Sequence, residues 1–404
     1  MRHPDTISDD TLPDAAAPAT PQLPVPTRRA WLKGLGLASV GAAALAAGCS
    51  KLATEATAAP AVVAGPDTSG PAILGANESP FGPAPSAVDA MTKVLTKTAR
   101  YADPETMELQ KLIGSIEGVD PEQVFIANGS SPILAAFGEM IAMKGKGQLV
   151  TSLATYEGVP RSAAEYGAEV IMTPLTADYT IDLDAMLAKV SAKTTATYVC
   201  NPNNPTGNMV DPVKLKAFAI AASKTAPVFI DEAYLTLADD YDGNVMTSLV
   251  RDGHNVVICR TFSKIYGMAG QRVGYGIASK DLAGQMARTV RMGGVNHLGL
   301  TMAAASLQDK AFVASMQPKF KTGRERLYKM AASYGRPIAS NPQASFVFFD
   351  TGMESKVFAE KMMAEGVKVV GRSWKGYETW TRICVGEDWE LDRCEAALKK
   401  VLSA

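Results

Sequence analysis

The sequence has few of the residues that metal centres and disulfide-rich scaffolds depend on. Its three histidines are scattered at His3, His254 and His297, which argues against a histidine-rich metal site. Its five cysteines are too few for a disulfide framework in 404 residues, and no Cys-x-x-Cys spacing occurs. The four cysteines that follow Cys49 could pair in an oxidising compartment, but their spacing does not show whether they do.

An excess of charge and a long apolar run are also missing. The formal net charge is −1, so nothing indicates a nucleic-acid or strongly acidic partner. The charge-free apolar stretch over residues 34–48 is too short to be a confident membrane span. With 47% hydrophobic and 20% charged residues, the chain has the composition of a globular enzyme with one large or two medium domains.

The first 65 residues differ in character from the rest of the chain. Residues 1–26 are rich in Pro, Ala, Asp and Thr and show no hydrophobic period, which is typical of disorder. Thr27-Arg-Arg-Ala-Trp-Leu-Lys33, followed by the mildly apolar stretch, resembles a twin-arginine export signal. That resemblance implies a periplasmic protein that leaves the cytoplasm already folded. A basic or disordered tail is the alternative.

The end of this leader leaves two processing routes open. Leu45-Ala-Ala-Gly-Cys49 resembles a lipoprotein cleavage box, which would make Cys49 a lipid anchor. Cleavage after Cys49, in the alanine-rich segment, would instead release a soluble periplasmic protein. Residues 53–65 are small and polar and indicate a linker in either case. We therefore assign 1–65 to an export signal and linker.

A lysine in a glycine-rich segment carries the strongest chemical signal. Lys264 follows an apolar run typical of a buried strand, and it lies beside two hydroxyls, Thr261 and Ser263, with Arg272 eight positions further on. A lysine at a crowded, partly dry site loses its proton readily and attacks carbonyl groups. Hydroxyls and an arginine suit a phosphate. An aldehyde and a phosphate on one molecule describe pyridoxal 5'-phosphate (PLP).

The whole segment from Thr261 to Gly276 resembles the lysine-bearing segment of class I/II aminotransferases, especially the histidinol-phosphate aminotransferase branch. Thr-Phe-Ser-Lys is followed by Gly-x-Ala-Gly-x-Arg-x-Gly-Tyr, and Asn201-Pro-Asn-Asn-Pro-Thr-Gly207 fits the same family. The resemblance implies the α/β PLP-dependent transferase fold type I, with a mostly parallel central sheet and a smaller α/β domain. It places the large PLP-binding domain at 104–291 and the small domain at 66–103 plus 292–404. Short apolar strands that alternate with helical patterns favour the same α/β class.

The resemblance also assigns roles to individual residues. Lys264 would bind the cofactor aldehyde, Asp231 would pair with the ring nitrogen, and Asn204 and Tyr234 would bind the ring oxygen. Tyr156 would stack on the ring. The phosphate would lie at a helix start, among residues from two segments and a tyrosine of the second subunit in a homodimer: Gly129, Ser130, Ser131, Ser263, Arg272 and Tyr101. Arg382 would bind the substrate carboxylate, and Asn77 would line the substrate mouth.

These assignments predict an enzyme that moves an amino group between an amino acid or amine and a 2-oxo acid. No metal is expected. Two alternatives remain at this stage. A PLP-dependent decarboxylase or lyase of the same fold would use Lys264, Asp231 and Arg272 as well. A non-catalytic exported binding protein would have kept the site without using it.

Overall fold

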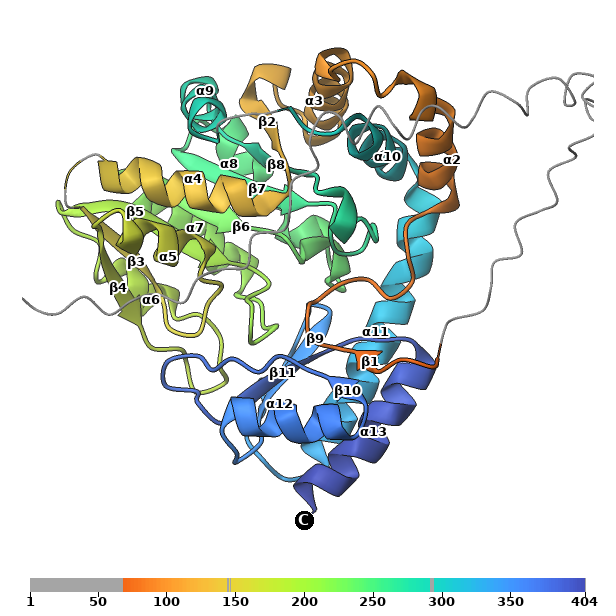
Figure 1. Cartoon of the computed structure of the whole chain (residues 1–404). Helices are drawn as coiled ribbons and strands as arrows, with labels where there is room; N and C mark the ends of the chain where they lie inside the picture. The colour runs from red at the N-terminus through yellow and green to blue at the C-terminus, as the bar shows by residue number, and fades with distance from the viewer. Residues whose placement is uncertain (1–67, 144, 146, 291–293, 404) are drawn as a thin grey trace, which may run out of the picture. The chain divides into compact units, whose positions relative to one another are not determined.

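The structure is a computed structural model, and it describes residues 68–143, 145, 147–290 and 294–403 (Figure 1). The expected export signal, linker and Cys49 lie outside these residues. Within them, no helix combines the length and the apolar character needed to cross a bilayer. The four cysteines described, Cys200, Cys259, Cys384 and Cys394, are free and buried.

A seven-stranded sheet forms the centre of the fold, with strand order β2-β8-β7-β6-β5-β3-β4. Only β8 runs antiparallel to its neighbours, and the other adjacent strands are parallel. The predicted α/β class with a mostly parallel sheet is therefore confirmed. The strands are β2 (Val124–Ala127), β3 (Gln148–Ser152), β4 (Glu169–Thr173), β5 (Thr194–Cys200), β6 (Val228–Asp231), β7 (Val256–Thr261) and β8 (Gly274–Ile277).

Helices cover both faces of this sheet, because its central strands are apolar on both sides. One core joins the sheet to α2, α3, α6, α7, α8 and α10, and the other joins it to α4, α5 and α9 (Figure 1). These helices are α2 (Pro85–Val94), α3 (Asp103–Glu117), α4 (Ser130–Met143), α5 (Gly158–Glu165), α6 (Leu183–Leu187), α7 (Pro212–Ala222), α8 (Thr247–Arg251), α9 (Lys280–Thr289) and α10 (His297–Gln308).

A separate core forms around two small sheets and the C-terminal helices. It contains β1 (Ala72–Ile73) paired with β10 (Val367–Lys368), β9 (Phe346–Asp350) paired with β11 (Trp380–Cys384), and α11 (Lys310–Ala332), α12 (Ser355–Ala364) and α13 (Asp388–Leu402). Helices α2 and α10 pack on the core of the large sheet, although their residues fall in the segments expected to form the small domain. The division at 104 and 291 stays a prediction.

Several local predictions need correction. The sequence pattern predicts a helix over 87–99, whereas the structure has α2 over Pro85–Val94 and then a 3₁₀ turn over Leu95–Lys97. The pattern from Gln148 predicts a strand that reaches Tyr156, but β3 ends at Ser152 because the chain turns through a left-handed residue, Ala154. Ser131 is predicted to cap a helix that begins at Pro132, but α4 begins at Ser130, so Ser131 lies within its first turn. The remaining 3₁₀ turns are Pro121–Gln123, Leu235–Leu237, Asp242–Asn244 and Ala269–Gln271.

Candidate active site

A cavity of about 460 Å³ opens at the carboxyl ends of β6 and β7, where parallel sheets bind their ligands. Segments far apart in the sequence contribute its walls. It brings together most of the residues expected to form the site: Asn77, Ser130, Ser131, Tyr156, Asn204, Asp231, Tyr234, Ser263, Lys264, Arg272 and Arg382. Gly129 does not line the cavity but lies against Arg272, which does, and Tyr101 lies elsewhere.

Lys264 lies in the loop that connects β7 to its antiparallel neighbour β8. Its Nζ donates a 3.0 Å hydrogen bond to the main-chain oxygen of Asn77. Burial, together with the positive charge of Arg382, lowers the pKa of the Lys264 ammonium to about 8. The neutral amine, which a nucleophilic attack on an aldehyde requires, is therefore far more populated near neutral pH than in an ordinary lysine.

Asp231 ends β6 and is 2% exposed. Its carboxylate accepts hydrogen bonds from the main-chain N–H of Ala233 at 3.0 Å and the hydroxyl of Tyr198 at 3.2 Å. Burial raises the pKa of Asp231 to about 6, despite these two donors. Both partners are neutral, so a cationic group in the cavity would stabilise the ionised carboxylate.

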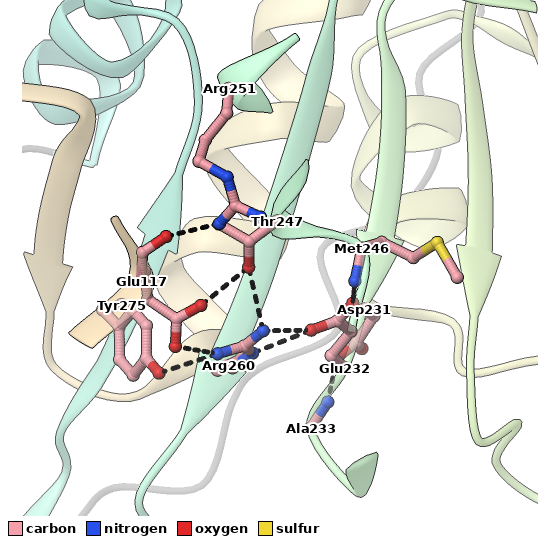
Figure 2. Close-up of polar contacts among 9 residues, drawn as sticks. All are labelled: Glu117, Asp231, Glu232, Ala233, Met246, Thr247, Arg251, Arg260 and Tyr275. Atoms are coloured by element: carbon pink, nitrogen blue, oxygen red, sulfur yellow. Dashed lines mark hydrogen bonds and ion pairs between the residues drawn. The ribbon is translucent and has the colours of Figure 1, made fainter. Parts of the chain in front are cut away.

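The strand end that carries Asp231 is fixed by a buried ion cluster (Figure 2). Glu232 accepts a 2.7 Å hydrogen bond from Arg260 Nε, which comes from the neighbouring strand β7. Arg260 also contacts Glu117 of α3 and, at 3.1 Å, Thr247 of α8. Because successive side chains of a strand point to opposite faces, this cluster holds β6 and β7 together behind the cavity.

An anion cradle lies at the start of α4. Ser130 and Ser131 form the first turn of this helix, whose N-terminal N–H groups favour negative charge. Arg272 donates to Ser263 Oγ at 3.4 Å and has a left-handed backbone, with φ of 55°. A Cβ at Gly129 would collide with the Arg272 guanidinium, so only glycine allows this arrangement.

The remaining predicted residues are linked to one another. Asn77 Nδ2 donates a 2.8 Å hydrogen bond to Tyr234 Oη, and Arg382 Nη1 donates a 2.7 Å hydrogen bond to Asn204 Oδ1. Burial raises the pKa of Tyr156, which lines the cavity beside Ser131. Asn77 therefore contacts two catalytic candidates, Lys264 and Tyr234, in addition to lining the mouth.

Two residues need separate description: Tyr101, which lies away from the cavity, and Arg372, which lines it. Tyr101 is 91% exposed and lines a different hollow, beside Asn296 and His297. Arg372 lines the cavity and was not predicted, because it lies outside the motifs that we compared with the family. It forms an ion pair with Glu157, and its guanidinium lies 5.1 Å from the Trp374 ring centre. The sequence gives no signal for this contact.

The cavity fits PLP on three separate counts. The cradle at α4 suits its phosphate, the buried carboxylate of Asp231 lacks a cation that the ring nitrogen would provide, and Lys264 has an amine with a lowered pKa. Fold and site together define the class of PLP-dependent enzymes of fold type I.

Comparison with known proteins narrows this class. The aminotransferase class I and II family matches residues 71–398. Histidinol-phosphate aminotransferase from Brevibacillus brevis is 31% identical over 330 residues, which cover 82% of this chain and 90% of that protein. The histidinol-phosphate aminotransferase from Moorella thermoacetica is 32% identical over 333 residues, which cover 82% of this chain and 85% of that protein. The structure of histidinol-phosphate aminotransferase from Sinorhizobium meliloti in complex with pyridoxal-5'-phosphate is 30% identical with a TM-score of 0.73, covering 82% of this chain and 90% of that one. The chain thus belongs to the aminotransferase class I and II family.

Proposed function

We propose that this chain is a PLP-dependent aminotransferase that moves an amino group between an amino acid or amine and a 2-oxo acid. The observation that carries the proposal is the single cavity in which an amine of lowered pKa, a buried carboxylate and an anion cradle converge. The family and its histidinol-phosphate aminotransferase relatives support the same activity.

Each residue of the cavity has a separate role in the proposed reaction. When bound, PLP supplies an aldehyde that condenses with amines and a ring that accepts electron density from the substrate Cα. Lys264 Nζ would hold the aldehyde and, once released from it, would take up the substrate Cα proton as a general base and deliver it as a general acid to the carbon that was the aldehyde. Asp231 would keep the ring nitrogen protonated. Arg382 orients the substrate carboxylate with its planar guanidinium.

The phosphate and ring contacts hold the cofactor while Lys264 is released from it. Ser130, Ser131, Ser263 and Arg272 would bind the phosphate, and Asn204 and Tyr234 would hold the ring oxygen. These contacts keep the reacting atoms in place between the two halves of the reaction.

The test is a donor screen on the purified, PLP-loaded protein. Histidinol phosphate belongs in the panel because of the relatives' activity, together with common amino acids, with 2-oxoglutarate and pyruvate as acceptors. We expect a true donor to abolish the visible absorbance of the cofactor and to yield an oxo product, and Lys264→Ala to abolish both. Release of carbon dioxide without amino transfer would indicate the decarboxylase alternative. A Lys264→Ala protein with unchanged biological effect would support a binding role.

We also propose a homodimer in which Tyr101 reaches the cofactor phosphate of the other subunit. The exposure of Tyr101 supports this proposal, and exposed apolar side chains lie on the two helical segments that flank it, at Leu95, Met107 and Ile116. Mixing Tyr101→Phe with Lys264→Ala chains would then restore one site with an intact Lys264 and Tyr101. Activity of the mixture no greater than that of its Tyr101→Phe component would contradict the shared site.

Export through the twin-arginine route is a further proposal, which rests on the sequence of residues 27–48. Replacing Arg28 and Arg29 by lysine should retain the protein in the cytoplasm, and unchanged export would reject the proposal. A Cys49→Ala variant then separates a lipid-anchored protein, which would lose its membrane fraction, from a soluble periplasmic one, which would not change.

A further inference from the structure

Asn77 has an unusual backbone and a central place in the site. Its φ is 55°, in the left-handed region, and the residue is only 3% exposed. Asparagine tolerates this conformation better than most residues, but the conformation still requires support from its neighbours. The main-chain oxygen of Asn77 accepts from Lys264, and its side-chain amide donates to Tyr234.

Cys384 provides that support from the last strand of the protein, β11. Its thiol donates to Asn77 Oδ1 at 2.8 Å and accepts from the Asn77 main-chain N–H at 3.2 Å. The Cys384 thiol thus binds both the main-chain N–H and the side-chain amide oxygen of Asn77. Cys384 is 2% exposed, so water cannot readily replace either hydrogen bond.

The direction of these hydrogen bonds sets the direction of the next one. With Oδ1 occupied by the thiol, the amide turns its Nδ2 to Tyr234, whose hydroxyl oxygen accepts. The hydroxyl hydrogen of Tyr234 then remains available for an acceptor in the cavity. The carbonyl of Asn77 is held at Lys264 by the same backbone conformation.

We propose that Cys384 is a positioning residue that fixes Asn77 and thereby orients both the Lys264 amine and the Tyr234 hydroxyl. This inference rests on the proposed function of the cavity. Charged and titratable groups that act on Lys264 include Arg382, Asp231 and Glu78 as well as Cys384 itself, and the first three are unchanged by substitution at Cys384.

The test compares two substitutions that differ in hydrogen bonding. Cys384→Ser keeps a donor and an acceptor, whereas Cys384→Val has a similar volume and neither. Cys394→Val is the matched control, because Cys394 is a buried cysteine in the core around α13. The first readout is the rate at which an acylating reagent modifies Lys264 in the cofactor-free protein, followed against pH by peptide mass spectrometry.

We expect Cys384→Val to lower the pH midpoint of Lys264 modification by about half a unit or more, because an ammonium that loses an acceptor is less stable. Cys384→Ser and Cys394→Val should retain the wild-type midpoint. The pH titration of the visible absorbance in the PLP-loaded protein should shift only in Cys384→Val, with kcat reduced more than KM is changed.

Equal midpoints and spectra in Cys384→Val and Cys394→Val would overturn the inference. If Cys384→Val fails to fold, Cys384→Ala gives the same comparison with less steric demand. A wild-type protein that forms no PLP adduct at Lys264 would refute the proposed function itself. If the wild-type protein forms the adduct but Cys384→Val changes neither the pH midpoint nor the absorbance titration, only the role of Cys384 is refuted.

Discussion

Arg382 Nη1 lies 2.7 Å from Asn204 Oδ1 and joins strand β11 to the turn after β5. These residues were expected to bind different partners, the substrate carboxylate and the ring oxygen. Their contact leaves the Nδ2 hydrogens of Asn204 as the group able to donate to a ring oxygen. Arg382 also donates to the main-chain oxygen of Gly75 at 2.7 Å, so its guanidinium is held from two sides.

Replacing Arg382 by lysine should therefore weaken substrate binding, although the positive charge is kept. Lysine keeps the charge but cannot bind Asn204, Gly75 and a carboxylate through one planar group. We expect kcat/KM for carboxylate donors to fall by about a hundredfold, as when a charge-assisted hydrogen bond is lost from a buried site. Steady-state kinetics measure this change, with Arg326→Lys as the surface control. Equal kinetics in both variants would show that Arg382 does not bind substrate.

The lowered pKa of Lys264 predicts a pH dependence for cofactor capture. Only the neutral amine attacks an aldehyde, so the rate of adduct formation in the cofactor-free protein should rise as pH increases through about 8 and then level off. Arg382→Gln removes a positive charge near Lys264, which should raise its pKa and move the midpoint to higher pH. Borohydride trapping with peptide mapping follows the adduct. A midpoint that stays at the wild-type value in Arg382→Gln would contradict this electrostatic coupling.

Asp231 should be needed for electron withdrawal more than for holding the cofactor. Asp231→Asn keeps the shape of the side chain but cannot stabilise a protonated ring nitrogen. We expect kcat to fall by at least about a hundredfold, the scale of losing one electrostatic stabiliser in an active site. The absorbance of the bound cofactor, together with kcat, separates the two effects. Asp252→Asn, a change at an exposed aspartate, is the control, and a kcat near wild type in Asp231→Asn would exclude the proposed pairing.

Breaking the ion cluster behind the cavity should lower the stability of the protein, although the cluster does not contact the substrate. Arg260→Met would leave Glu117 and Glu232 buried without their cationic partner. The free energy of unfolding should fall by about 3–5 kcal/mol, which is typical of breaking a buried ion pair from one side. Urea unfolding measures it. Arg326→Met, which breaks a more exposed pair with Asp392, should cost at most about 1 kcal/mol. Similar losses in the two variants would count against a special role for the buried cluster.

The cavity was largely predictable because its residues follow strand ends and helix starts. Asp231 ends the apolar strand β6 and Lys264 lies three residues after the end of β7, and the carboxyl ends of adjacent parallel strands meet at one edge of a sheet. Ser130 and Ser131 were placed by the strand-turn-helix pattern, even though the helix begins two residues before Pro132, the expected first helical residue. The fold class followed from the same alternation of strands and helices.

Contacts made by side chains across long sequence separations could not be predicted in this way. Arg372 reaches the cavity from an irregular segment after β10, and its partner Glu157 lies in the turn before α5. The support that Cys384 gives to Asn77 depends on a left-handed backbone and on the register of β11. Neither follows from periodicity or composition, because each requires the packed tertiary structure.

The hydrogen bond from Arg382 to Gly75 joins positions 307 residues apart, near the two ends of the part of the chain that the structure describes. During synthesis, a ribosome-bound chain that has not yet emerged as far as β11 therefore lacks one wall of the pocket. Vitamin B6 capture in its final geometry must therefore await the emergence of β11, and a truncation that removes only β11 and α13 would leave the lysine present but its surroundings unfinished.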